Sequence, residues 1–120
     1  VFVSCVFASP QALAYSSGGA PWVAVHFETA DAEEVWIRAD DHSIQSLTIR
    51  FPGCSSSFGS FSTDGYLDIG RSELLQDEDD AGKLRVLTVP WFEPVEGKRN
   101  RDHTKVFHFR GCKLEKVVDQ

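Results

Sequence analysis

Apolar and polar residues alternate along the central part of the chain. From Ser46 to Phe51, serine, threonine and arginine alternate with leucine, isoleucine and phenylalanine. A period of two residues is typical of a β-strand that packs one face against a core and turns the other to water. Pro52 and Gly53 end the pattern, because proline lacks the N–H that a strand ladder requires and glycine accepts turn conformations.

The same alternation recurs along the chain and predicts about six to eight short strands separated by turn-forming residues. These strands cover residues 22–28, 35–38, 43–51, 66–69, 83–91 and 104–118. No strand alternates with a long helix, so we predict an all-β fold, a small antiparallel β-sandwich or barrel. Residues 71–78 offer the one place for a short helix, with Ser72 as its N-cap, and a loop fits them equally well.

A repeat relates two parts of the sequence. FPGC at residues 51–54 matches FRGC at 109–112, and the tripeptides DHS at 41–43 and DHT at 102–104 precede them. The repeat indicates two related halves, which could be Greek-key-like. Because each repeated strand closes on a cysteine, we expect a disulfide between Cys54 and Cys112 that pins a sheet across its width.

The heptapeptide SIQSLTI, residues 43–49, resembles the strand that closes each motif of the βγ-crystallins. This resemblance implies a fold of paired Greek keys. The calcium-ligand pair of that family is not evident, since Ile44 and Gln45 stand where its hydroxyl ligand would be. We assign no family on this basis.

The cysteine count bears on where the protein works. There are three cysteines, and Cys5 lies in an apolar run, residues 1–14, that ends in the A-x-A pattern preceding signal-peptide cleavage. Residues 1–14 are either a signal-peptide remnant or a first strand with Cys5 as a buried thiol, and residues 15–120 form a single β domain. Without Cys5, the pair Cys54 and Cys112 fits an oxidising compartment, so we expect a secreted, extracellular protein. No run reaches the roughly 18 apolar residues of a transmembrane helix.

The charge of the chain is negative and unevenly distributed. The net charge of −6 argues against general nucleic-acid binding, which needs a basic surface. Residues 1–82 carry 13 acidic and 3 basic side chains, whereas residues 83–120 carry 9 basic and 5 acidic ones. Either the two parts pack together and neutralise each other, or the second part presents a basic contact surface.

Histidines provide the candidate chemistry for an enzyme. His108 occupies an outward strand position, His103 directly precedes that strand, and His26 shares a strand face with Glu28 by spacing. Two histidines, or a histidine and a carboxylate, could act as general base and acid in a small secreted hydrolase such as a ribonuclease. The acids at 77–80 are consecutive and point in different directions, and no zinc-binding spacing occurs, so we predict no metal site and no cofactor.

The segment 91–102 provides the candidate binding surface. Trp91 and Phe92 come directly before a basic cluster formed by Lys98, Arg99 and Arg101. Exposed aromatic rings suit sugar stacking or a protein contact, whereas buried ones would plug the end of the core. We therefore predict a binding protein rather than an enzyme, such as an effector, toxin, inhibitor or lectin-like module, with a protein or carbohydrate partner. The hydrolase is the alternative.

Overall fold

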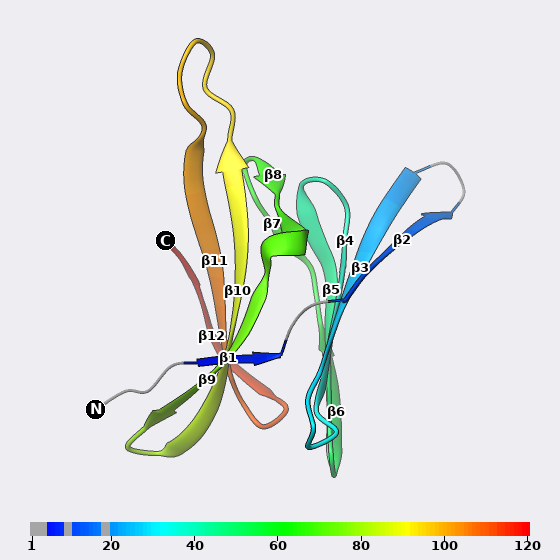
Figure 1. Cartoon of the computed structure of the whole chain (residues 1–120), viewed down its shortest axis with the longest axis vertical. Helices are drawn as coiled ribbons and strands as arrows, with labels where there is room; N and C mark the ends of the chain where they lie inside the picture. The colour runs from blue at the N-terminus through cyan, green and yellow to red at the C-terminus, as the bar shows by residue number, and fades with distance from the viewer. Residues whose placement is uncertain (1–4, 9–10, 18–19) are drawn as a thin grey trace.

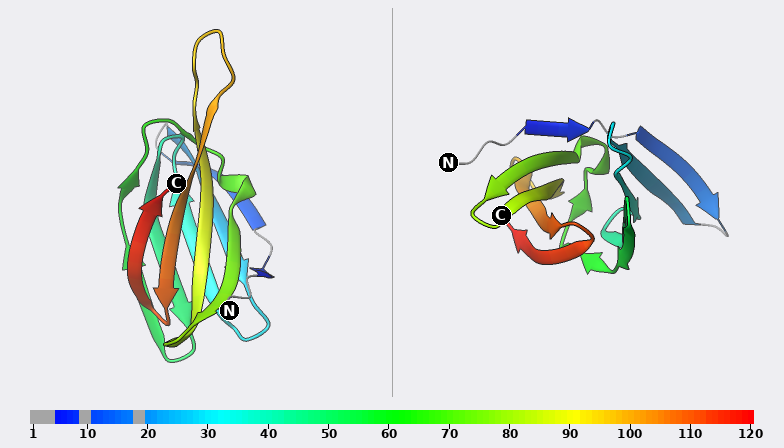
Figure 2. Two further views of the ribbon diagram at one scale, coloured as in Figure 1. Left: turned by 90° about the vertical axis from the view of Figure 1, so that its left-hand side faces the viewer. Right: turned by 90° about the horizontal axis from the view of Figure 1, so that it is seen from below.

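The protein is a sandwich of two antiparallel β-sheets. The computed structural model describes residues 5–8, 11–17 and 20–120, and side chains from residue 24 onward. In this part of the chain, two six-stranded sheets face each other, as the view from below shows (Figure 2). The predicted all-β sandwich is therefore confirmed.

The first sheet, sheet A, holds the N-terminal strand and the second half of the chain. Its path is β1 (Cys5–Ala8), β9 (Glu73–Asp79), β10 (Gly82–Glu93), β11 (Arg101–Arg110) and β12 (Lys113–Asp119), and β8 (Tyr66–Leu67) also pairs with β10. The second sheet, sheet B, runs through β2 (Gln11–Ser17), β3 (Ala20–Glu28), β4 (Glu34–Ala39), β5 (Ser43–Phe51) and β6 (Cys54–Phe58), and β7 (Phe61–Ser62) also pairs with β5. Figure 1 labels these strands.

The order of strands differs from the Greek-key halves that the repeat suggested. Along the path of each sheet the neighbours are consecutive in sequence, except that β1 crosses over to pair with β9, and off these paths β8 pairs with β10 and β7 with β5. A Greek key requires a long connection that returns a fourth strand beside the first. Short turns join β3, β4 and β5 here, as they join β9 to β10 and β11 to β12, so each sheet is an up-and-down meander.

The segment expected to be a short helix or a loop is a strand. Glu73–Asp79 pairs with β10 along its whole length, and Leu74 fills the core opposite Leu87. The ladder and the buried leucine outweigh the helix signal at Ser72, because the acids that follow offer no apolar stripe to a helix. Within the described chain, the helical element is one 3₁₀ turn, Ile69–Arg71, just before β9.

Alternate residues of both sheets meet in one core. The side chains buried in this core are Val25, Phe27, Val35, Ile37, Ile44, Leu47 and Ile49 from sheet B and Leu74, Leu87, Val89, Phe107 and Phe109 from sheet A. The residues between them face the other way, as the period of two requires, and on sheet A three of these, Leu84, Val86 and Val106, form a second buried apolar cluster. This alternation fixes which side chains of β3, β4 and β11 reach the surface.

The predicted disulfide forms, but it joins the two sheets rather than two places in one sheet. Cys54 begins β6 in sheet B, and Cys112 lies in the turn between β11 and β12 in sheet A, with a Cα–Cα distance of 6.2 Å. Each cysteine follows a glycine with positive φ, 90° at Gly53 and 60° at Gly111. The repeated Gly-Cys is therefore a tight turn used once in each sheet.

The N-terminal segment contributes strands to both sheets. Cys5–Ala8 lies in sheet A and Gln11–Ser17 in sheet B, while the side chain of Cys5 lies outside the described part of the structure. The structure does not test the processing of residues 1–14, which stays a prediction. Among the residues that the structure describes, no helix has the length and hydropathy that crossing a bilayer requires.

Candidate functional site

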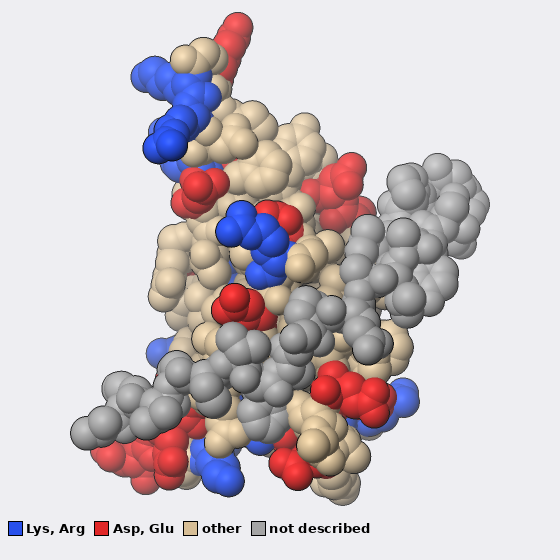
Figure 3. Space-filling view, viewed as in Figure 1, with Lys and Arg blue, Asp and Glu red and all other residues tan. Residues whose placement is uncertain are grey.

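The loop between β10 and β11, residues 94–100, extends well beyond the body of the sandwich (Figures 1 and 2). Lys98 and Arg99 in the loop and Arg101 at the start of β11 are all exposed. They form a basic cluster at one extreme of the molecule (Figure 3). Among the described residues, none of the three cations lies in an ion pair. We call this segment, residues 94–101, the basic hairpin tip.

The corresponding turn in sheet B is much shorter. Three residues, 40–42, connect β4 to β5, the strand whose repeat partner is β11. Asp40 closes this turn by accepting hydrogen bonds from the backbone N–H groups of His42 and Ser43, at 2.8 and 2.7 Å. These bonds hold the pKa of the Asp40 carboxyl below its ordinary value. A hairpin of this sandwich therefore closes with three residues, and the longer loop at 94–100 exceeds what the fold needs.

The aromatic residues at the base of the tip are only partly accessible. Trp91 is 7% exposed, and its ring stacks on His103 with centroids 4.1 Å apart. Phe92 is half-buried and stacks on Tyr66, which is 42% exposed. Trp91 thus follows the buried alternative, and Phe92 and Tyr66 are the rings that reach the surface there. Tyr66 was not identified from the sequence, because it meets Phe92 through β8, a strand of two residues.

The three candidate histidines lie in three different surroundings. His26 is on the face of sheet B turned away from sheet A, where its ring stacks on Trp36. His103 stacks on Trp91, and its Nε2 lies 2.7 Å from Oε1 of Glu93. His108 is five residues further along β11, so it projects from the opposite face of that strand. The structure brings no two of them together, and a catalytic pair of histidines is not formed.

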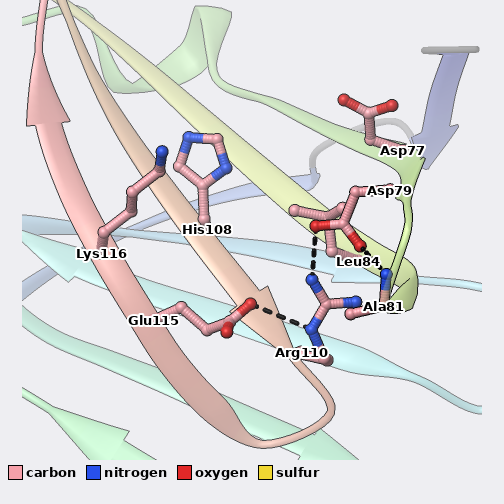
Figure 4. A pocket seen from close by; sticks show the side chains of 8 residues that line it. All are labelled: Asp77, Asp79, Ala81, Leu84, His108, Arg110, Glu115 and Lys116. Atoms are coloured by element: carbon pink, nitrogen blue, oxygen red, sulfur yellow. Dashed lines mark hydrogen bonds and ion pairs between the residues drawn. The ribbon is translucent and has the colours of Figure 1, made fainter. Parts of the chain in front are cut away.

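His108 lines a pocket of about 630 Å³ on sheet A. Figure 4 shows its imidazole between Lys116 of β12 and Asp77 of β9. Burial and then the positive charge of Lys116 lower the pKa of His108, which favours the neutral imidazole.

Arg110 closes one side of this pocket. Its guanidinium donates to Oδ2 of Asp79 at 2.7 Å and to Oε1 of Glu115 at 3.0 Å (Figure 4). The hydrogen bond from Arg110 lowers the pKa of Asp79 and raises the pKa of Arg110 itself. Both carboxylates are thereby engaged, which leaves His108, Asp77 and Lys116 as the groups of this pocket able to act on a ligand.

A second polar cluster lies on the outer face of sheet B. His26 and Glu28 share this face, as their spacing predicted, and Glu34 of β4 joins them. One ligand atom from each residue lies within 4.8 Å of the other two. The sequence predicted no metal site. It did not identify this cluster, because sequence spacing does not show that Glu34 faces Glu28 across the β3–β4 turn.

Comparisons with protein-family models, with curated proteins and with solved structures find no match to this chain. No family match therefore supports the resemblance of residues 43–49 to a βγ-crystallin strand. The meander topology also differs from paired Greek keys. Fold and surface together define a class: a disulfide-linked antiparallel β-sandwich with one extended basic hairpin.

Proposed function

We propose that the protein is a secreted binding protein that contacts its partner through the basic hairpin tip. The observation that carries the proposal is the loop at residues 94–100, which extends beyond the sandwich (Figure 1), with Lys98, Arg99 and the adjoining Arg101 all exposed. Loops on a rigid scaffold commonly carry function, because they vary without cost to the core. Effectors, toxins, inhibitors and lectin-like modules work in this way.

The charges of the tip indicate an anionic partner, and we favour an acidic protein surface. Exposed charges of one sign accelerate association and make it sensitive to salt. The neighbouring rings of Phe92 and Tyr66 supply the apolar contact that a protein interface needs at its centre. An anionic carbohydrate would use the same cations, with less need of the rings.

The disulfide supports the extracellular part of the proposal. A bond between Cys54 and Cys112 persists in oxidising surroundings and is rare where glutathione keeps thiols reduced.

The test is a triple variant, Lys98→Ser, Arg99→Ser and Arg101→Ser, in affinity capture from cells and extracellular extracts. We expect the captured partner to be lost, with affinity at least about tenfold weaker, because three exposed charges leave the interface. The control replaces Lys83 and Lys113 with serine, two exposed cations of sheet A outside the tip and outside the His108 pocket, and should capture the partner as the wild type does. If the tip variant also captures the partner with wild-type affinity, the tip is not the contact surface. Heparin-like polysaccharide as competitor separates a carbohydrate partner from a protein.

The second candidate is a hydrolase at the pocket that contains His108. Its support is a neutral imidazole between Asp77 and Lys116, a set that could move a proton and hold an anionic substrate. Incubation of the same preparation with RNA and oligosaccharide panels tests it. Cleavage that disappears in His108→Ala would assign the activity to the pocket instead of the tip.

A further inference from the structure

We propose that His26, Glu28 and Glu34 bind a divalent transition-metal ion, zinc, on the outer face of sheet B. The site is separate from the basic hairpin tip, which belongs to sheet A. Imidazole nitrogen and carboxylate oxygen are ordinary zinc ligands, and three protein ligands leave one coordination position for water or for an atom of a partner.

The fold itself brings the three side chains together. Val25 and Phe27 of β3 point into the core, so His26 and Glu28 point outward on the same face. Glu34 is the direct partner of Glu28 in the β3–β4 ladder. The turn between the strands therefore sets two carboxylates side by side, two register positions from the imidazole and on the same face of the sheet.

The distances suit a zinc ion. Nε2 of His26 lies 3.3 Å from Oε1 of Glu34, and all three ligand atoms lie within 4.8 Å of one another. Two ligands at about 2.0–2.2 Å from zinc with a tetrahedral angle between them are about 3.3–3.6 Å apart. The histidine and Glu34 already have this spacing, and the ligand atom of exposed Glu28 lies within 4.8 Å of both of theirs.

The buried imidazole nitrogen is the independent observation. His26 is 91% buried, since its exposed fraction is 9%, and Nε2 makes no hydrogen bond to any group that the structure describes. Its contact with Glu34 lacks hydrogen-bond alignment, although the distance is short. A buried polar atom without a hydrogen bond destabilises the fold, and a metal ion would use its lone pair.

Neighbouring residues hold two of the three protein ligands, His26 and Glu34, in place. The ring of His26 stacks on Trp36 with centroids 3.9 Å apart and an angle of 11° between the planes, which restrains its rotation. Oε2 of Glu34 lies 3.9 Å from Nη1 of Arg50, while Oε1 points to His26. Arg50 thus orients the carboxylate, and Oε1 stays available to the metal.

The experiment is zinc titration of the metal-stripped full chain by isothermal calorimetry, with the visible spectrum of bound cobalt as a second readout. We expect one metal ion per chain in the wild type and a rise in the unfolding temperature when zinc is added. Glu28→Gln, an exposed substitution that leaves the core intact, should weaken zinc binding at least tenfold. His26→Gln and Glu34→Gln should abolish it.

The matched control is His103→Gln. His103 also stacks on a tryptophan and lies near a glutamate, but the described residues supply no third ligand there. Zinc binding should be unchanged in this variant and in Cys5→Ser, which removes a competing thiol. Absence of zinc binding in the wild type, or wild-type affinity in Glu28→Gln, would overturn the proposal. Loss of binding in Cys5→Ser would overturn it as well.

Discussion

At the scale of single residues, His108 makes the free energy of unfolding depend on pH, and this dependence can be measured. Burial is the main cause of its lowered pKa, Lys116 adds to it, and Asp77 and Glu115 oppose it. The unfolded chain therefore takes up the proton first as the pH falls. The free energy of unfolding should be greatest above pH 6.5, the ordinary value, and should decrease as the pH falls from there through the lowered pKa.

Urea unfolding of the wild type and of His108→Gln between pH 8 and pH 5 measures this effect. The wild type should lose stability relative to the variant across that range, because glutamine takes up no proton. Lys116→Gln should reduce the loss, since it removes one of the two causes of the shift. Parallel pH profiles for the wild type and His108→Gln would contradict the assignment.

Residue patterns predicted contacts within a strand better than contacts between strands. The spacing of His26 and Glu28 showed that they share a face, because a strand alternates with a fixed period. Glu34 and Tyr66 were missed, since each meets its partner through the register of a neighbouring strand. Trp91 could not be placed either, because alternation does not show whether a ring near a strand end is covered.

At the scale of elements, charge misled the interpretation of residues 73–79. The acids of this segment lack the alternation of a half-buried strand, yet Glu73–Asp79 pairs with β10 over seven register positions. Its polar end projects into solvent at the β9–β10 turn, where Asp79 binds Arg110. The sequence alone did not reveal that β10, a strand of 12 residues, is long enough to pair with this acidic end.

The hairpin tip makes an element-scale prediction about stability. Residues 94–100 can be replaced by Asn-Gly, which favours the two-residue turn of an ordinary hairpin. The ladder between β10 and β11 ends at Glu93 and Arg101, so the replacement keeps every pair of the ladder. A shorter loop costs less closure entropy, and we expect the variant to equal the wild type or exceed it by about 1 kcal/mol.

Thermal and urea unfolding measure this change, and capture of the partner should be lost in the same variant. If the variant with the shortened loop unfolds at a distinctly lower urea concentration than the wild type, the long loop supports the fold. In that case its length would no longer indicate function.

At the scale of the whole molecule, acidic side chains of residues 1–82 form ion pairs with basic side chains of residues 83–120. Glu33 near sheet B receives a 2.7 Å bond from Arg85 of sheet A, and Asp79 pairs with Arg110. The expected neutralisation between the acidic and basic parts of the chain therefore occurs, and among the described residues the three cations of the basic hairpin tip take no part in it. The repeat did not predict the strand order, because alternation is the same in a meander and a Greek key.

The disulfide joins the two sheets at the end of β11 that lies opposite the basic hairpin tip. Its removal gives the last prediction. Cys54 and Cys112 are 58 residues apart, so by the chain-entropy estimate the bond contributes about 4 kcal/mol. We expect Cys54→Ser with Cys112→Ser to unfold at much lower urea concentration than the oxidised wild type, and reduced wild type to match the variant. The shared core of both sheets should still let the variant fold without urea. A difference below about 1 kcal/mol would contradict this prediction and would show that the unfolded chain is already compact, so that the bond constrains it little.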